Sequence, residues 1–274
     1  MGDRPLTPLL AAACLLAASV RGEVPRDDAR AGWRDLSILN ANEAYRAFST
    51  AADANPADRD ARLGEAVSLL NVEPQTDDSI ARASGLFESL RSGEKGDEAA
   101  VGAAYYLARI AQLHAGAPDR NAVVRDFRDL IARHPLSPYA QLAAPKLAIL
   151  LLYDDVPAAE WQRRAREVED LIPTLSTPAA RRDTRLVLAG ALIRLRGDHA
   201  RAYPLITQCL AENLVIRPSH LNSLLLQAAE SARVLGRNGE AAAYYRKFLS
   251  EFPSDTKTDE IRRRLGLLVR RPRQ

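Results

Sequence analysis

The most constraining feature of this 274-residue chain is a short pattern that returns six times along it. Each copy has a residue that is usually small, an aromatic or apolar residue four positions later, and another apolar residue three positions after that. Spacings of four and three place all three side chains on one face of a helix. The copies begin 38 to 41 residues apart, at Ala44, Ala83, Val123, Trp161, Ala202 and Ala241. A period near 39 residues predicts a repeat fold built from stacked helical units.

Proline marks the end of four of these copies. It stands five residues after the third position of the pattern, at Pro56, Pro135, Pro173 and Pro253. Because proline cannot extend a helix, each of these residues predicts that the helix carrying the pattern ends just before it.

A second helix is predicted before each patterned one. Twelve residues before the first position, a small residue often recurs, namely Gly32, Ala111, Gly190 or Ala229. A small side chain there would let two antiparallel helices approach closely. The glycines of Gly236–Gly239 and Gly197 indicate the tight turn between the helices. Each unit is therefore predicted to be a helix hairpin that buries its apolar face by stacking with its neighbours.

The expected fold is all-α, with about six antiparallel helix hairpins and one capping helix at the C-terminus. We expect one repeat domain over residues 23–269, followed by a basic tail at 270–274. The predicted helices pair as 27–38 with 42–54, 58–70 with 78–91, 98–115 with 120–133, 138–153 with 157–171, 178–195 with 199–212 and 218–235 with 239–251, and the capping helix covers 257–269.

The N-terminus resembles a secretory signal. A weakly basic start at Arg4 precedes an uncharged stretch of 13 residues from Pro8 to Val20, which is too short to span a bilayer. We expect cleavage after Gly22 and a periplasmic or secreted protein. An uncleaved anchor, a buried first helix or a lipid on Cys14, which would make an outer-membrane lipoprotein, are the alternatives.

Composition excludes several kinds of function. The formal net charge is only +3, which argues against a general nucleic-acid binder. Removal of residues 1–22 would leave Cys209 as the only cysteine, so neither an intramolecular disulfide nor a cysteine metal site is expected. Cys209 falls on the apolar stripe of a helix and is predicted to be a small buried residue.

No catalytic or metal-binding pattern is found. The four histidines, at 114, 134, 199 and 220, lack a second ligand at helical spacing, and His134 is expected to end a helix. A paired-carboxylate enzyme would need an aromatic-lined cleft, whereas Trp33 and Trp161 are explicable as packing. Glu94, Asp97 and Glu98 are typical of a solvated helix start. We therefore expect no enzymatic activity, no catalytic residues, no metal and no cofactor.

The chain resembles the tetratricopeptide repeat family over about residues 27–253. The most specific part is the string at 239–253, GEAAAYYRKFLSEFP, together with FRDLIARHPLS at 127–137. Both are similar to bacterial envelope members that act in the Bam complex and the Tol-Pal system. The family repeats at about 34 residues and this chain at about 39, so HEAT-type repeats of ~40–47 residues are the alternative fold.

The resemblance implies a right-handed superhelical solenoid whose concave groove is lined by the first helix of each hairpin. It implies a non-catalytic scaffold of the cell envelope that binds a peptide or a partner helix. A peptidoglycan-associated binding or hydrolytic protein and an outer-membrane lipoprotein that takes part in protein assembly are the alternatives. The groove positions carried over from the family are Tyr105, Arg109, Gln112, Lys146, Arg194, Gln227, Glu230 and Arg233.

Arginines gather at the C-terminal end. A solvated helix face is the simpler interpretation, and attraction to anionic lipid headgroups is the other. The peripheral membrane contact would use Arg262, Arg263, Arg264, Arg270 and Arg271.

Overall fold

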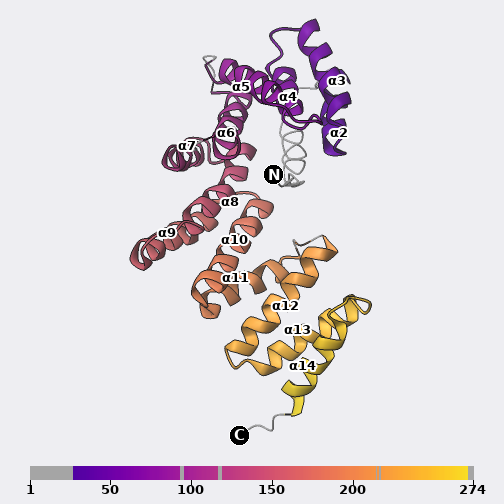
Figure 1. Cartoon of the computed structure of the whole chain (residues 1–274), viewed down its shortest axis with the longest axis vertical. Coiled ribbons are helices and arrows are strands. Elements are labelled where there is room, and N and C mark those ends of the chain that lie inside the picture. The colour runs from indigo at the N-terminus through magenta and orange to yellow at the C-terminus, as the bar shows by residue number, and fades with distance from the viewer. Residues whose placement is uncertain (1–26, 93–95, 117–118, 214, 216, 271–274) are drawn as a thin grey trace. The chain divides into compact units, whose positions relative to one another are not determined.

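In the computed structural model, the described part of the chain is residues 27–270 without 93–95, 117–118, 214 and 216. Every regular element in this part is a helix (Figure 1). The elements are α2 (Asp27–Ser37), α3 (Ala41–Ala54), α4 (Arg59–Leu69), α5 (Asp77–Ser92), α6 (Glu98–Leu113), α7 (Arg120–Arg133), α8 (Pro138–Leu152), α9 (Ala158–Leu171), the short 3-10 helix η1 (Ile172–Thr174), α10 (Pro178–Arg196), α11 (His199–Ala211), α12 (Pro218–Val234), α13 (Asn238–Glu251) and α14 (Thr258–Arg270).

These elements confirm the predicted all-α fold. Each predicted helix is present, and its ends lie within two residues of the predicted ones. Only η1 was not expected. The four prolines that were predicted to end helices each stand two residues beyond the last residue of α3, α7, α9 or α13.

Aspartates fix where several helices begin. The carboxylates of Asp58, Asp97, Asp119 and Asp198 accept hydrogen bonds from backbone N–H groups in the first turns of α4, α6, α7 and α11. These N–H groups have no partner within the helix, so a capping side chain stabilises each helix start by about 1 kcal/mol.

The repeated pattern forms the buried face of the second helix in each hairpin. All eighteen of its side chains are between 0 and 6% exposed. Cys209, which occupies a third position, is fully buried as predicted. The pattern is therefore a packing pattern, and its period is the spacing of the hairpins.

Polar contacts between neighbouring hairpins repeat the same period. Each joins side chains that lie 37 to 41 residues apart in the sequence. The pairs are Tyr45–Arg82, Arg59–Asp97, Glu98–Ser137, Gln162–Arg201, Tyr203–Glu240 and Tyr153–Arg194. A separation of about one period means that corresponding helices of consecutive hairpins lie side by side.

The prediction that small residues let helices approach holds at some positions only. A Cβ on Gly32 would come within 2.7 Å of the Phe48 ring on α3, so any larger residue would have to displace that ring. At Gly190, in contrast, the nearest atoms are Tyr153 Oη and Arg194 Nη2, both at 3.3 Å, so the small residue faces a polar contact. The sequence analysis missed Gly64, whose Cβ would overlap Phe48 from the opposite side.

The chain divides into two compact units, with the boundary between Leu147 and Ala148 inside α8. An aromatic cluster forms part of the core of the first unit. Tyr106 stacks on Phe87 with centroids 5.2 Å apart, and Tyr139 lies 6.0 Å from Tyr106 and 6.1 Å from Tyr105. Phe127 of α7 completes the cluster, 6.2 Å from Tyr105.

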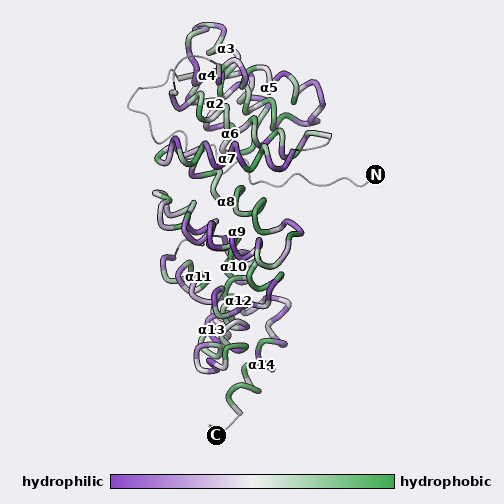
Figure 2. The backbone as a smooth tube through the Cα atoms, turned by 90° about the vertical axis from the view of Figure 1, so that its left-hand side faces the viewer, coloured by the Kyte–Doolittle hydropathy of each residue, from purple (hydrophilic) through white to green (hydrophobic). Residues whose placement is uncertain are grey.

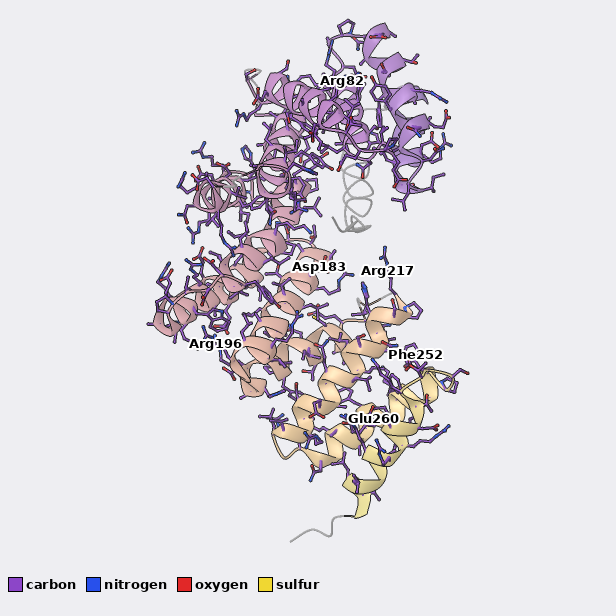
Figure 3. All side chains as sticks on the ribbon, in the orientation of Figure 1. Arg82, Asp183, Arg196, Arg217, Phe252 and Glu260 are labelled. Atoms are coloured by element: carbon purple, nitrogen blue, oxygen red, sulfur yellow. The ribbon has the colours of Figure 1, made fainter. Side chains whose placement is uncertain are left out.

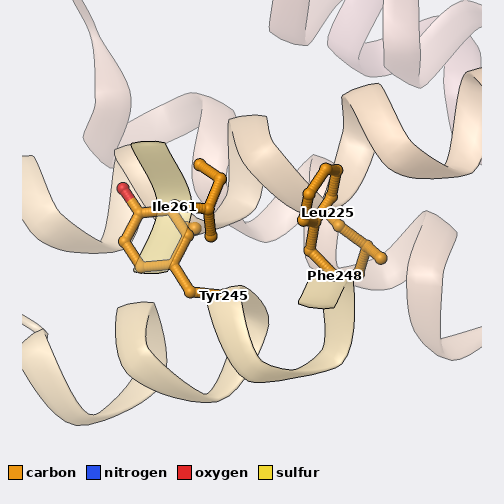
Figure 4. Packing of buried hydrophobic residues seen from close by; sticks show 5 residues of the cluster. Leu225, Tyr245, Phe248 and Ile261 are labelled. Carbon is orange, nitrogen blue, oxygen red and sulfur yellow. The ribbon is translucent and has the colours of Figure 1, made fainter. Parts of the chain in front are cut away.

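Aliphatic and aromatic side chains from three helices form a core in the second unit. Leu225 of α12, Tyr245 and Phe248 of α13 and Ile261 of α14 pack together (Figure 4). Arg196, labelled at the end of α10 in Figure 3, lies with its guanidinium 4.7 Å from the centre of the Trp161 ring. Both tryptophans, Trp33 and Trp161, are buried, as the packing interpretation predicted.

Candidate functional site

The residues predicted to line a groove all lie on first helices of hairpins. Tyr105, Arg109 and Gln112 are on α6, and Lys146 is on the part of α8 that belongs to the first unit. The remaining four belong to the second unit, with Arg194 on α10 and Gln227, Glu230 and Arg233 on α12.

Tyr105 is a core residue and not a groove residue. Its side chain is 2% exposed and lies among Tyr106, Phe127 and Tyr139. It offers almost no surface to a partner, so this part of the predicted set is corrected. Lys146 is half-buried.

Arg109 is a partly buried charge with an incomplete set of hydrogen bonds. Its Nη1 donates a hydrogen bond to Gln112 Oε1, and its Nε is buried without a hydrogen-bond partner. Among the residues that the structure describes, no carboxylate pairs with it. Burial lowers the pKa of Arg109, while the neighbouring Tyr105 and Tyr106 oppose this shift.

The surroundings of Arg109 include a histidine and an exposed apolar side chain. Burial, and then the Arg109 charge, lower the pKa of His114, while Asp77 raises it. Leu113, the last residue of α6, is 47% exposed. Arg109, Gln112, Leu113 and His114 thus form one surface at the C-terminal end of α6, which we call the α6 end surface.

In the second unit, Arg194 contacts a residue that the sequence analysis missed. Its Nη2 donates a hydrogen bond of 2.9 Å to Tyr153 Oη, and the guanidinium carbon lies 5.4 Å from the centre of that ring. Tyr153, Arg194 and Arg233 all stand eight residues before the first position of their repeat. Tyr153 could therefore have been predicted as a candidate from its position in the repeat.

Glu230 and Arg233 are brought together on α12. Arg233 donates two hydrogen bonds to the Glu230 carboxylate, and Arg264 of α14 approaches the same carboxylate to 3.4 Å. Hydrogen bonding to Arg233 lowers the pKa of Glu230, although partial burial opposes this. Arg233 and Arg264 thus share the Glu230 carboxylate, whereas Gln227 is exposed nearby on the same helix.

The other residues with reactive or titratable side chains cap helices, form polar contacts within the fold or are buried. Asp97 caps α6 and forms an ion pair with Arg59 at 2.7 Å, and Glu98 accepts a hydrogen bond from Ser137. Burial raises the pKa of the Cys209 thiol to about 11. His134 ends α7, as predicted. Glu94 lies outside the described residues.

Neither a metal-binding cluster nor a membrane-spanning helix is present among the described residues. No group of three or more histidine, cysteine, aspartate or glutamate side chains is arranged to hold a metal ion there. None of the helices in the described ranges combines the length and the apolar character that crossing a membrane requires.

The C-terminal arginines differ in their surroundings. Arg262 forms an exposed ion pair with Asp259, and Arg264 contacts Glu230 and Glu260. Arg263 is exposed. The side chain of Arg270, the residue Arg271 and the predicted signal at 1–22 with Cys14 lie outside the described part of the chain.

Comparison with known proteins gives similarities in structure only. No protein-family model and no curated protein match the chain. Among solved structures it is similar to a thermophilic tetratricopeptide repeat protein of Thermus thermophilus, with 16% identity, 89% of this chain and 98% of that chain covered, and a TM-score of 0.38. A tetratricopeptide repeat protein from Parabacteroides merdae has 13% identity, coverages of 88% and 85%, and a TM-score of 0.48. The human IFIT1 dimer with m7Gppp-AAAA has 13% identity, coverages of 95% and 67%, and a TM-score of 0.45.

Proposed function

We propose that this protein is a non-catalytic scaffold that binds another protein through the exposed side chains of its first helices, and that the α6 end surface accepts an acidic side chain of that partner. The observation that carries the proposal is the state of the Arg109 guanidinium. Within the described residues, its buried Nε has no hydrogen-bond partner and no carboxylate pairs with it. A partly buried charge without a counter-ion is costly, and a partner that supplies a carboxylate removes this cost.

The chemistry around Arg109 suits a peptide partner. A carboxylate would accept a charge-assisted hydrogen bond from the guanidinium, which is about twice as strong as one between neutral groups. Exposed Leu113 next to it would contact an apolar side chain of the same segment. Extended peptides and helices bind repeat proteins through such mixtures of polar anchors and apolar contacts.

First helices of the second unit carry a comparable mixture. Leu195 of α10 is 44% exposed and Val234 of α12 is 50% exposed, each directly after an exposed arginine. Within the second unit, these pairs offer contacts to a partner on two hairpins. Their arginines already have partners in Tyr153 and Glu230, so we assign the anchoring role to Arg109.

The cell envelope is the proposed location. The uncharged stretch from Pro8 to Val20 and the compact residues before Glu23 support an exported protein. Mass spectrometry of the protein purified from its native cells tests this proposal. A mature chain that begins at Glu23 supports it, and a chain that retains Met1 or carries a lipid on Cys14 contradicts the cleavage we propose.

Affinity capture from the envelope fraction tests the binding function. The bait is the wild-type protein, Arg109→Met, or the control Arg133→Met, which removes an arginine that is 72% exposed on the second helix α7. We expect the wild type and the control to capture the same proteins. With Arg109→Met, recovery of these proteins should fall about tenfold or more, because a hydrogen bond to a charged group is lost. Equal recovery with all three baits would contradict the proposal.

A further inference from the structure

The solvent face of the last helix, α14, is both apolar and basic. Its inner residues Ile261, Leu265 and Leu268 pack on the core that α12 and α13 form. On the outside, Leu267 is 64% exposed and Val269 is 63% exposed. Figure 2 shows the apolar end of α14 as the green segment that precedes the C-terminus. We call the outer residues Arg262, Arg263, Leu267 and Val269 the cap face.

The cap face is more apolar than the solvated helix face that was the simpler interpretation of the C-terminal arginines. Arg264, one of the arginines that would have made it polar, turns toward Glu230 and Glu260 instead, and the latter is labelled in Figure 3. Arg263 stands four residues before Leu267, and the two share a stripe of the helix. Arg262 and Val269 lie seven residues apart and share a second exposed stripe, which is separated from the first around the helix.

Charge is distributed very unevenly between this end and the rest of the chain. Residues 257–274 contain seven basic and two acidic side chains, a formal net charge of +5. The other 256 residues therefore carry a net charge of −2, because the whole chain carries +3. A strongly basic end with exposed apolar side chains complements a surface that is anionic outside and apolar beneath.

We infer that the cap face binds the surface of a membrane that contains anionic phospholipid. Arg262 and Arg263 would contact headgroup phosphates, while Leu267 and Val269 would enter the boundary between headgroups and acyl chains. A second copy of the chain is the less suitable occupant, since two ends with a charge of +5 would repel each other. This inference is independent of the partner that Arg109 would bind.

Vesicle co-sedimentation with the full-length chain tests the inference. The vesicles contain phosphatidylcholine alone or phosphatidylcholine with 30% phosphatidylglycerol. The variants are Arg262→Glu with Arg263→Glu, and Leu267→Ser with Val269→Ser. The controls make the same chemical changes elsewhere: Arg46→Glu with Arg133→Glu, whose side chains are 70% and 72% exposed, and Leu136→Ser, which is 79% exposed. Circular dichroism confirms that each variant is folded.

Wild-type protein and both controls should bind the anionic vesicles more strongly than the neutral ones. The apolar N-terminal segment is the same in every variant, so it cannot cause a difference in vesicle binding between them. Such differences therefore measure the contribution of the substituted residues. Each arginine near an anionic surface contributes about fivefold in affinity, so the double charge reversal should lower binding at least 25-fold. The Leu267 and Val269 variant should also lower it.

Three results would overturn the inference. In the first, the wild type shows no preference for anionic vesicles. In the second, the charge-reversal control lowers binding as much as the cap-face variant. In the third, the cap face binds soluble polyglutamate but not the vesicles, which would assign it to an acidic protein.

Discussion

Replacing Leu39 by glycine should stabilise the protein. Leu39 follows α2 with a backbone φ of +65°, and its N–H bonds to Leu36 O while the N–H of Asn40 bonds to Asp35 O. The same pair of hydrogen bonds closes α12, where Gly236 holds the equivalent position with a φ of +74°. Both residues stand five before the first position of their repeat, so the first repeat has leucine where the sixth has glycine.

The gain follows from backbone sterics and chain entropy. An L-residue in the left-handed region destabilises the folded state by about 1–2 kcal/mol relative to glycine. Glycine is more flexible in the unfolded chain, and this greater loss of entropy on folding offsets about 0.5–1 kcal/mol of the gain. The leucine side chain is 63% exposed, so little buried apolar area is lost. We expect a net stabilisation of roughly 0.5–1 kcal/mol, which raises Tm by about 1–4 °C.

Thermal unfolding followed by circular dichroism, together with urea titration, measures this change. Leu39→Ala is the matched control because it removes the side chain but keeps the Cβ that causes the steric cost. Gly236→Ala reverses the substitution and should destabilise the protein by about 1 kcal/mol. If Leu39→Gly is no more stable than Leu39→Ala, the turn does not carry the strain that we assign to it.

Three further predictions follow from the packing and the charges. Gly64→Ala should lower Tm because its Cβ would overlap the Phe48 ring, whereas Gly85→Ala, which meets no atom within 4 Å, should gain about 1 kcal/mol in helix propensity. Arg109→Met should leave Tm unchanged or raise it by about 2–4 °C, since it removes a partly buried charge that no carboxylate among the described residues pairs with, and a loss of several degrees would contradict this. NMR titration should place the pKa of His114 below its ordinary value of 6.5 and show it rising in Arg109→Met, so no shift on substitution would refute the coupling. Because His114 binds a proton less readily in the folded state than in the unfolded state, it should reduce the stability of the protein as pH falls through 6.5.

The fold was largely predictable from sequence because it repeats. Apolar side chains at spacings of four and three, with proline two residues beyond the helix end, are local signals that each hairpin carries for itself. Trp161 and Cys209 were correctly predicted to be buried because they occupy pattern positions. The glycine that Phe48 requires at position 64 was missed, since that contact joins two different hairpins.

The candidate surface was less predictable because it depends on which side chains cover one another. Tyr105 was carried over from a family with a shorter period, and in this chain Phe127 and Tyr139 cover its ring. Arg264 was placed with the C-terminal arginines on a solvated or membrane-facing helix surface, but it contacts Glu230, 34 residues away on another helix. Arg109 was named from the sequence as a groove residue, but that no carboxylate pairs with it among the described residues becomes evident only from the packed structure.

Site-specific photo-crosslinking in living cells tests the central claim most directly. A photoreactive phenylalanine derivative replaces Leu113 in the α6 end surface or, as a control, Arg125, which is exposed on the second helix α7. The proposed function predicts a defined crosslinked protein at position 113 that is absent at position 125 and is lost when Arg109→Met is added. Crosslinking at both positions alike, or a product at 113 that persists with Arg109→Met, would contradict it.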